Sequence, residues 1–262
     1  MIHLVALQFA DCSLGRLDYA SLSQQALMEM VIEETVHKEK ICGNCDEPKD
    51  IEEWQGMTMK EGQVVKIDWR NFGLSESLHF EWIPSSVSEF LVSWNKLSNT
   101  VDLASLPAAM EQFDVGGNSL IGSIDLEKLP ENMNRLGIYI NQLSGSLKLT
   151  SLPGTLQFFH ASGNKFSGSI DLTRLPRDLL MFDISENQLN GSLNLTRLPP
   201  NIRGLRITNN SFSGTVSLSH LPQGLLELKL DANDFSGEVF LSNDFFDRVH
   251  VQNTALIKRR VR

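Results

Sequence analysis

The sequence predicts an α/β repeat solenoid that is mostly β: a curved rod of stacked coils with a parallel sheet on its concave side. The first observation is a step of 23 residues, kept by four residue types along most of the chain. Such a period indicates a repeat architecture in which each unit buries its apolar face against its neighbours. The residues that keep the step are Pro84, Pro107, Pro130, Pro153, Pro176, Pro199 and Pro222; Asn95, Asn118, Asn141, Asn164, Asn187, Asn210 and Asn233; Gly122, Gly145, Gly168, Gly191, Gly214 and Gly237; and Leu103, Leu126, Leu149, Leu172, Leu195, Leu218 and Leu241.

The second observation is the apolar pattern inside each unit. Apolar residues stand eight, five and three positions before each asparagine, as Leu179, Phe182 and Ile184 do before Asn187, and another follows two positions after it. The alternation has a period of two, which predicts a short strand with one buried face. Strands from successive units can align only in parallel.

The second half of each unit predicts a tight return of the chain. In the segment S-G-S-I-D-L-T-R-L-P, which ends at Pro176, Gly168 suits a turn with a positive φ angle. Ile170 and Leu172 alternate again, which predicts a second short strand on the variable side of the coil. The few residues left before Leu179 fit a turn rather than a full helix.

The seven asparagines are expected to form a structural ladder. An asparagine amide has two donors and an acceptor, so it can pair with backbone groups that a bend leaves unsatisfied inside the solenoid. Losing such a partner costs about 1–3 kcal/mol for each buried group that is left unpaired.

The units LQFFHASGNKFSGSIDLTRLP and LLMFDISENQLNGSLNLTRLP resemble leucine-rich repeats of the plant-like class. Their LP and DLT spacing is most similar to the 23-residue repeats of leucine-rich-repeat proteins from kinetoplastid protists. The resemblance covers roughly residues 64 to 256 and carries the pattern L-x-x-L-x-L-x-x-N-x-L. It implies a leucine-rich-repeat rod, while a right-handed parallel β-helix is the alternative fold.

The third observation concerns the ends, which depart from the repeat as capping units do. Phe72 and Thr254 stand where the ladder asparagine would be. We therefore expect an acidic helical N-terminal cap over residues 1–62, a solenoid of seven full repeats and two atypical terminal units over 63–257, and a basic tail over 258–262. Residues 1–62 hold twelve acidic and five basic residues, a balance of −7.

Within the cap, residues 18 to about 40 predict a helix. Ser21-x-x-Gln24 is a possible capping box, and the apolar stripe consists of Ala26, Leu27, Met30 and Val31. The following stretch resembles the N-terminal cap of plant-type repeats, W-x-G-V-x-C, with Trp54 and Gly56 matching. Met57 and Met59 replace its valine and cysteine. The disulfide that the resemblance implies cannot form there, which fits a reducing compartment.

Composition excludes several classes of protein. A hydrophobic content of 41% argues against a wholly disordered chain, and a net charge of −9 argues against a nucleic-acid partner. No uninterrupted apolar run is close to the length of about 20 residues that a transmembrane helix needs. The N-terminal segment MIHLVALQFADC is a poor secretory signal, so we expect a cytoplasmic protein, with the cell surface or secretion as the alternative. Glycans attached at the sequons of Asn190, Asn194 or Asn209 would favour that alternative.

The sequence predicts no cofactor, no metal site and no catalytic residue. Cys42-Gly-Asn-Cys45 is the one C-x-x-C, and only His37 lies near it, so structural cysteines are favoured over a local disulfide or metal site. No phosphate loop, H-E-x-x-H or G-x-S-x-G motif occurs. We therefore expect a protein that is not an enzyme.

Outward positions of the concave strands are the candidate binding site, because folding does not require particular residues there. Exposed aromatic and methionine side chains are typical anchors of protein interfaces. The alternative to a binding role is that neighbouring side chains cover these residues. The predicted partner-binding residues are Trp94, Arg135, Tyr139, Ile140, Phe158, His160, Met181, Asp183 and Arg206. We expect this chain to be an adaptor or scaffold whose partner is a protein or peptide. The alternative functions are the recognition domain of a surface or secreted protein and a structural subunit of a larger assembly. The oligomeric state is left open.

Overall fold

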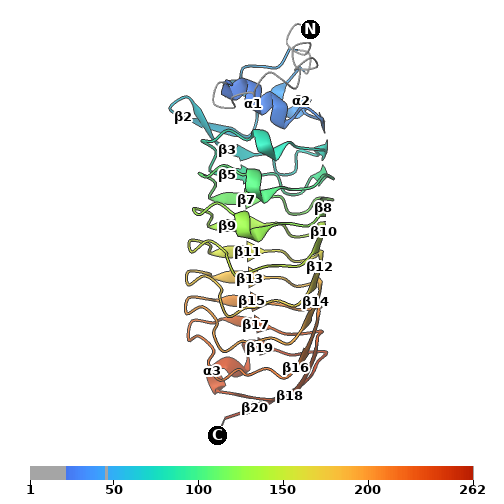
Figure 1. The fold of residues 1–262 in the computed structure, drawn as a ribbon, viewed down its shortest axis with the longest axis vertical. Coiled ribbons are helices and arrows are strands. Elements are labelled where there is room, and N and C mark those ends of the chain that lie inside the picture. The colour runs from blue at the N-terminus through green and yellow to red at the C-terminus, as the bar shows by residue number, and fades with distance from the viewer. Residues whose placement is uncertain (1–21, 45–46, 262) are drawn as a thin grey trace, which may run out of the picture.

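The computed structural model describes residues 22–44 and 47–261, which form a single rod of stacked coils (Figure 1). A ten-stranded sheet runs along one side, in the order β19-β17-β15-β13-β11-β9-β7-β5-β3-β2, and is parallel except for the β2–β3 hairpin. Its strands are β2 (Met57–Lys60), β3 (Gln63–Asp68), β5 (Glu89–Leu91), β7 (Gln112–Asp114), β9 (Arg135–Gly137), β11 (Phe158–His160), β13 (Met181–Asp183), β15 (Gly204–Arg206), β17 (Glu227–Lys229) and β19 (Val249–His250).

A second sheet of seven parallel strands lies on another side of the coils, in the order β20-β18-β16-β14-β12-β10-β8. Its strands are β8 (Ile121–Gly122), β10 (Gln142–Gly145), β12 (Lys165–Gly168), β14 (Gln188–Gly191), β16 (Ser211–Gly214), β18 (Asp234–Leu241) and β20 (Ala255–Arg260). We call it the lateral sheet. A small third sheet consists of β1 (Thr35–Val36), β4 (Ser75–Glu76) and β6 (Lys96–Leu97).

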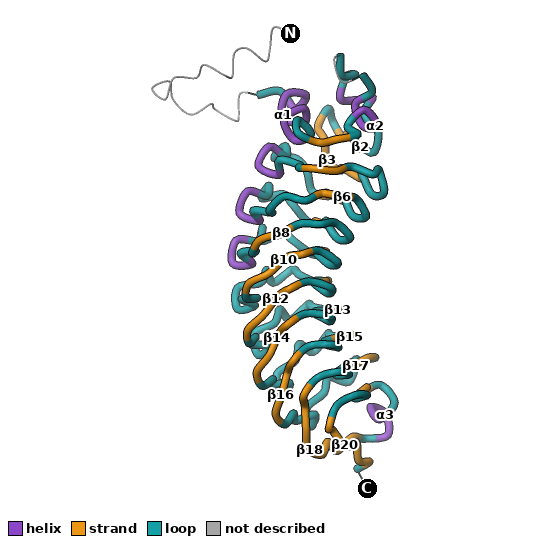
Figure 2. The backbone as a smooth tube through the Cα atoms, turned by 90° about the vertical axis from the view of Figure 1, so that its right-hand side faces the viewer, coloured by secondary structure: helices purple, strands orange, loops and turns teal. Residues whose placement is uncertain are grey.

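The register confirms that each coil is one sequence repeat. Phe158 in β11 is paired with Arg135 on one side and with Met181 on the other, its equivalents 23 positions away. The stack bends, with the ten-stranded sheet on the inner side of the bend (Figure 2). The predicted solenoid with a parallel concave sheet is therefore correct.

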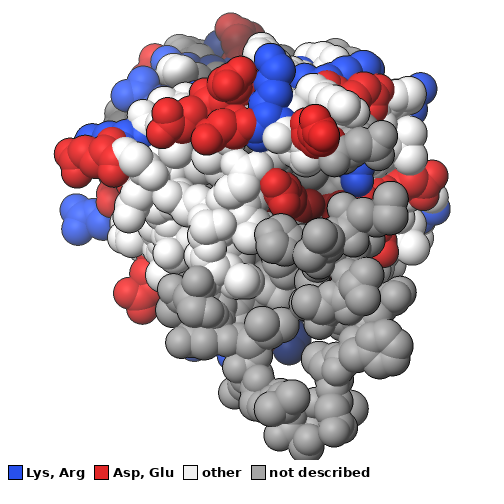
Figure 3. Space-filling model, turned by 90° about the horizontal axis from the view of Figure 1, so that it is seen from above, with Lys and Arg blue, Asp and Glu red and all other residues white. Residues whose placement is uncertain are grey.

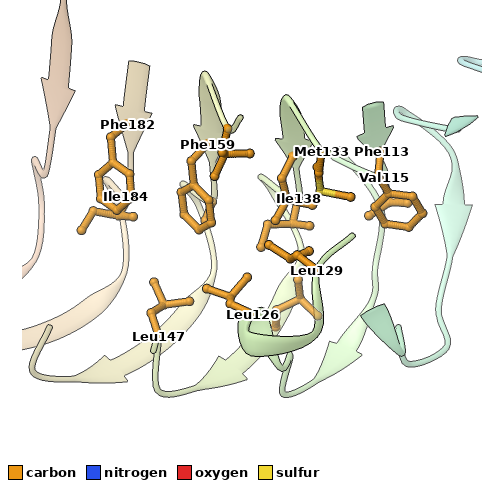
Figure 4. Packing of buried hydrophobic residues seen from close by; sticks show 14 of the residues in the cluster. Phe113, Val115, Leu126, Leu129, Met133, Ile138, Leu147, Phe159, Phe182 and Ile184 are labelled. Carbon is orange, nitrogen blue, oxygen red and sulfur yellow. The ribbon is translucent and has the colours of Figure 1, made fainter. Parts of the chain in front are cut away.

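The core is one continuous apolar interior that extends from the cap to the last coil. Phenylalanines of successive inner strands stack on one another, as Phe159 and Phe182 do with ring centroids 4.9 Å apart. Leu126, Leu129 and Leu147 fill the interior from the opposite side (Figure 4). Truncating one of these side chains to alanine should cost about 2–5 kcal/mol.

The seven ladder asparagines make the same bonds in every coil. The Nδ2 of Asn164 donates to the carbonyls of Ile138 at 2.9 Å and Ala161 at 3.2 Å, and its Oδ1 accepts from the N–H of Leu143 at 3.0 Å. Ile138 and Leu143 belong to the preceding coil, so each amide joins two coils. Four of the seven are buried and three are half-buried.

The return segments are short, as predicted, but the second strand lies earlier than expected. In the coil of β12 it covers Lys165–Gly168. Ile170 and Leu172 come after this strand, and their side chains are buried in the interior. Gly168 has a φ angle of 82° at the end of that strand. Three coils close with 3₁₀ turns, namely η3 (Phe80–Trp82), η4 (Leu103–Ser105) and η5 (Leu126–Lys128).

The expected single helix over residues 18 to about 40 is wrong in its extent. The chain forms α1 (Gln24–Val31), then β1, then α2 (Glu39–Cys42). Ser23 caps α1 by accepting a hydrogen bond from the N–H of Ala26, and the capping box proposed at Ser21 lies outside the described residues. Helix α1 buries Met28 and Val31, whereas Ala26, Leu27 and Met30 are half-buried.

The rest of the cap closes the N-terminal edge of the inner sheet. The turn η2 (Ile51–Glu53) leads into β2, which pairs antiparallel with β3. Trp54 is buried and donates from Nε1 to the Lys49 carbonyl at 2.8 Å. Figure 3 looks onto this end and shows acidic side chains at the margin of an uncharged area.

At the other end, α3 (Asn243–Phe246) precedes β19. Thr254 takes over part of the ladder role, since its hydroxyl donates to the Val251 carbonyl at 2.7 Å and accepts from the N–H of Leu256 at 3.2 Å. At the N-terminal end, Phe72 occupies the ladder position as a half-buried side chain packed on the core. Basic residues follow on β20, where Lys258 donates to the carbonyls of Phe246 and Val249.

Candidate functional site on the concave sheet

The residue before each ladder asparagine adopts a left-handed backbone conformation. In four successive coils this column holds Trp94, Gly117, Ile140 and Gly163, with φ angles of 60°, 64°, 48° and 65°. Glycine accepts this conformation freely, whereas an L-residue pays about 1–2 kcal/mol, and a β-branched residue is a genuine outlier there. Trp94 and Ile140 are nevertheless 50% and 48% exposed, so burial does not explain them.

Glycines in the adjoining coils make room for these side chains. A Cβ on Gly117 would lie 2.7 Å from Trp94 Cε3, and one on Gly163 would lie 3.2 Å from Ile140 Cγ1. Trp94 and Ile140 therefore lean over the glycine of the next coil. Large apolar groups and bare backbone alternate along this edge of the sheet.

Two further side chains of the concave surface also rest on glycine. A Cβ on Gly116 would lie 2.4 Å from the Tyr139 ring, and one on Gly204 would lie 2.5 Å from Met181 Cε. Distances below 3.0 Å do not occur for real Cβ atoms, so these glycines are required by the present positions of Tyr139 and Met181.

The aromatic side chains form a continuous row across the coils. Trp94 and Tyr139 have ring centroids 6.1 Å apart, and Tyr139 stacks on His160 at 4.3 Å with the planes inclined by 20°. Beside this row, the guanidinium of Arg135 lies over the Phe158 ring at 4.2 Å. Offset stacks and cation–π contacts of this kind hold side chains in fixed positions.

A hollow of about 400 Å³ lies beside Trp94 where the strands β3 to β9 end. We call it the concave hollow. The side chains that line it come from four successive coils: Asp68, Arg70, Asn71, Ser93, Trp94, Asp114 and Tyr139.

One wall of the concave hollow is an ion pair. Arg70 donates to both carboxylate oxygens of Asp68, from Nε at 2.7 Å and from Nη2 at 2.6 Å. The guanidinium lowers the pKa of Asp68, and Asp68 in turn raises the pKa of Arg70. The two charges cancel within this wall.

The pKa of Asp114 is shifted in the opposite direction from that of Asp68. Burial raises the pKa of Asp114, against the opposing effects of the Gly116 N–H and of the charges on His160 and Arg135. The Gly116 N–H donates to Oδ1 at 3.0 Å. A Cβ on Gly137 would lie 2.8 Å from the same oxygen, so glycine again leaves room for a functional group.

Tyr139 and His160 share a desolvated environment. Burial raises the pKa of Tyr139, although hydrogen bonds from the side chains of Ser93 and Trp94 act in the opposite direction. Burial lowers the pKa of His160, against the attraction of Asp183 and Asp114. At neutral pH the His160 ring is therefore mainly uncharged and can stack on Tyr139 without a charge to desolvate.

Towards the C-terminal coils the concave surface becomes a chain of alternating charges. Asp183 lies 3.7 Å from His160 and 3.8 Å from Arg206, and Arg206 pairs with Glu227 at 2.6 Å. Glu227 also pairs with Lys229 at 3.0 Å. Because opposite charges neutralise each other here, this half of the surface offers little net charge to a partner.

The nine residues predicted for binding all lie on the concave side but fall into three groups. The first group is Trp94, Tyr139, Ile140 and His160; the second is Arg135, Phe158 and Met181; the third is Asp183 and Arg206 in the charge chain. Half-buried side chains are found at Tyr139, Phe158 and Met181, in line with the alternative that neighbouring side chains cover them. Trp94 and Ile140, in contrast, are exposed.

Sequence reasoning missed the concave hollow itself. Asp68, Arg70 and Asn71 belong to the atypical first unit, and nothing in the sequence distinguishes Asp114 from the other outward residues of the strands. A usable signal was the set of glycines outside the repeating glycine column, namely Gly116, Gly117, Gly137, Gly163 and Gly204.

Within the described ranges 22–44 and 47–261, no cluster of three or more histidine, cysteine, aspartate or glutamate side chains could hold a metal ion. In the same part of the chain no helix is long and apolar enough to cross a bilayer. Cys42 is buried and its thiol donates to the Lys38 carbonyl at 3.3 Å, while Cys45 lies outside the described residues.

Comparison with known proteins supports the fold. A scan against protein-family models and a search of curated proteins find no match. Among solved structures, a plant ice-binding protein is similar with a TM-score of 0.59 and 18% identity, over 89% of this chain and 94% of the other. PEPR1 in the PEPR1–AtPEP1 structure is similar with a TM-score of 0.58 and 18% identity, over 90% of this chain and 41% of that one.

YopM from Yersinia enterocolitica has 27% identity and a TM-score of 0.53 over 68% of this chain. The chain has the leucine-rich-repeat fold. This leucine-rich-repeat chain spans 36% of the length of YopM. The likeness to kinetoplastid repeats and to a plant-type cap stays a prediction.

Proposed function

We propose that this chain is a non-catalytic interaction module that binds a protein or peptide across the concave sheet, over the coils that carry Trp94, Tyr139, Ile140 and Phe158. The observation that carries the proposal is the pair of bulky, exposed apolar residues at left-handed positions. Backbone strain persists where a fold over-determines it and clusters at functional sites. Trp94 and Ile140 stand at φ angles that L-residues rarely adopt, and about half of each side chain stays exposed.

The glycines support the same proposal. Three side chains of the surface, Trp94, Tyr139 and Met181, occupy space that a Cβ on the glycine of the adjoining coil would enter. An aromatic row with an exposed tryptophan at one end is typical of an anchor region, because aromatic side chains supply large contact areas at a small cost in conformational entropy.

Selection of peptides from a random displayed library tests the proposal directly. The full chain is the bait, and enriched peptides are measured against the double variant Trp94→Gly/Ile140→Gly, which the left-handed backbone accepts. Phe240→Ser is the matched control, since Phe240 is 60% exposed but lies on the lateral sheet. We expect the double variant to lose binding at least about tenfold and the control to keep it.

A second pair of variants places the binding along the sheet. Phe158→Ser and Met181→Ser should together weaken binding of the enriched peptides while the melting temperature stays within a few degrees. Equal binding by the double variant at Trp94 and Ile140, or no enrichment above a bait-free control, would overturn the proposal.

A second candidate function is recognition at the cell surface or after secretion. Asn190, Asn194 and Asn209 are all exposed, and Asn190 lies on β14 of the lateral sheet, so a glycan there would leave the concave sheet open. Mass spectrometry of the protein purified from its own cells tests this. Glycans at these sites would favour the second candidate, and unmodified asparagines would favour the cytoplasm.

A further inference from the structure

The charged side chains that line the concave hollow leave one negative charge in excess. The three charged residues are Asp68, Arg70 and Asp114, and the first two form the bidentate pair described above. Within the described residues, Asp114 makes no ion pair within 4.0 Å. One carboxylate therefore remains available in this space.

The nearby basic side chains have other partners. Arg70 is held by Asp68, and the Arg135 guanidinium lies over the Phe158 ring at 4.2 Å. The Nε2 of His160 is 2.7 Å from the Ser162 hydroxyl. A carboxylate offers about four lone-pair sites, and the Gly116 N–H at 3.0 Å occupies one of those on Asp114.

The remaining walls suit a cation rather than a second neutral group. Trp94 and Tyr139 line the same hollow, with ring planes tilted by 59° towards each other, and Trp94 is half exposed. The face of an aromatic ring attracts an ammonium or guanidinium group within about 6 Å of its centroid, and tryptophan does so most strongly. Tyr139 stacks on His160 with one face and rests on Gly116, so Trp94 is the ring that would add cation–π contact to an ion pair with Asp114.

We propose that the concave hollow binds the basic side chain of a lysine or arginine in a peptide that lies along the concave sheet. The ammonium or guanidinium group would pair with Asp114, and its alkyl stem would lie against Trp94 and Tyr139. A volume of about 400 Å³ is at the lower end of ligand pockets, which fits one long side chain. This inference rests on the proposed function, since a single side chain gives useful affinity only as part of a longer ligand.

The first experiment uses minimal probes on the full chain. Amide signals of Gly116 and Gly117 are followed by NMR during titration with N-acetyl-arginine methylamide and N-acetyl-lysine methylamide. N-acetyl-citrulline methylamide is the uncharged control, and glycine methylamide tests a free peptide amino group. We expect saturable shifts at both glycines with the arginine or lysine probe and none with citrulline.

Variants then identify the carboxylate responsible. Asp114→Asn keeps an acceptor for the Gly116 N–H and should weaken the basic probe at least about tenfold. Asp171→Asn, an exposed aspartate far along the chain, is the matched control and should change nothing. If Asp114→Asn fails to fold by circular dichroism, Trp94→Gly replaces it, and a loss of at least about threefold is expected from the missing ring.

Citrulline binding as tightly as arginine, or full affinity in Asp114→Asn, would overturn the inference. Saturation by glycine methylamide alone would also overturn it, in favour of a peptide amino terminus. The two proposals fail separately: enriched peptides that require Trp94 and Ile140 but lack basic residues refute only the basic side chain. Library peptides that ignore the concave sheet refute the proposed function itself.

Discussion

Ile140 and Ile121 offer a direct measurement of the strain on which the proposed function depends. Both are isoleucines with nearly the same exposure, 48% and 47%. They differ in backbone: Ile140 has a φ angle of 48°, whereas Ile121 lies in the strand β8. The same substitution to asparagine at both positions therefore isolates the cost of the left-handed conformation.

The expected magnitudes follow from burial and backbone. Full burial of an isoleucine is worth about 1.5–3 kcal/mol, so losing a half-buried one costs about 1–1.5 kcal/mol at either site. Asparagine tolerates the left-handed region, which returns about 1–2 kcal/mol at Ile140 only. We expect Ile121→Asn to destabilise the chain by about 1–1.5 kcal/mol and Ile140→Asn to be nearly neutral.

Urea unfolding of the two variants beside the wild type is the appropriate assay. Equal m-values would show that the same cooperative unit unfolds, a necessary check because repeat arrays can lose two-state behaviour. Ile140→Asn should also lose binding of the enriched peptides while Ile121→Asn keeps it. If both variants lose the same stability, the left-handed site stores no strain, and the reason for assigning Ile140 to binding is gone.

Three further outcomes are expected. Asn164→Ala should destabilise the chain by about 2–4 kcal/mol in urea unfolding, because it strands several buried backbone groups, whereas the exposed Asn190→Ala should change stability by less than about 0.5 kcal/mol. Phe159→Ala should cost about 3–5 kcal/mol in the same assay, as a fully buried ring leaves a cavity. Burial raises the pKa of Asp114 above its ordinary 3.8, so folding favours its protonated form. The wild type should therefore lose stability relative to Asp114→Asn as the pH rises through that raised pKa. Thermal melts in which the stability difference between the two proteins does not grow from pH 3 to pH 7 would contradict the raised pKa.

The repeat made the fold predictable at the level of single residues. Asn164 and Leu172 recur in register with their equivalents, so a single geometric solution had to serve every coil. The extent of the cap helix was not predictable in this way. The cap has no repeat, and its α1 ends at Val31 because the chain turns there into β1, a tertiary pairing with β4 that local pattern does not show.

The candidate site was predictable only in part for a related reason. Outward alternation placed Tyr139 and Phe158 on the concave sheet, since a period of two requires it. It could not show that Trp94, one residue off that alternation, would turn outward through a left-handed backbone. Nor could it show that Asp68 and Asp114, which lie in different coils, would line one hollow.

The alternation of Trp94, Gly117, Ile140 and Gly163 follows from the dimensions of the rod. Neighbouring parallel strands lie about 4.8 Å apart, so a side chain that leans over the next coil, as Trp94 and Ile140 do, needs a residue without a Cβ beneath it. A glycine between them doubles the spacing to about 10 Å and gives each side chain a bare backbone to lie on. Gly117 is therefore as much a part of the site as Trp94: Gly117→Ala would place a methyl group 2.7 Å from the indole ring and displace it. This substitution should lower binding of the enriched peptides as strongly as Trp94→Gly, although it removes no contact atom.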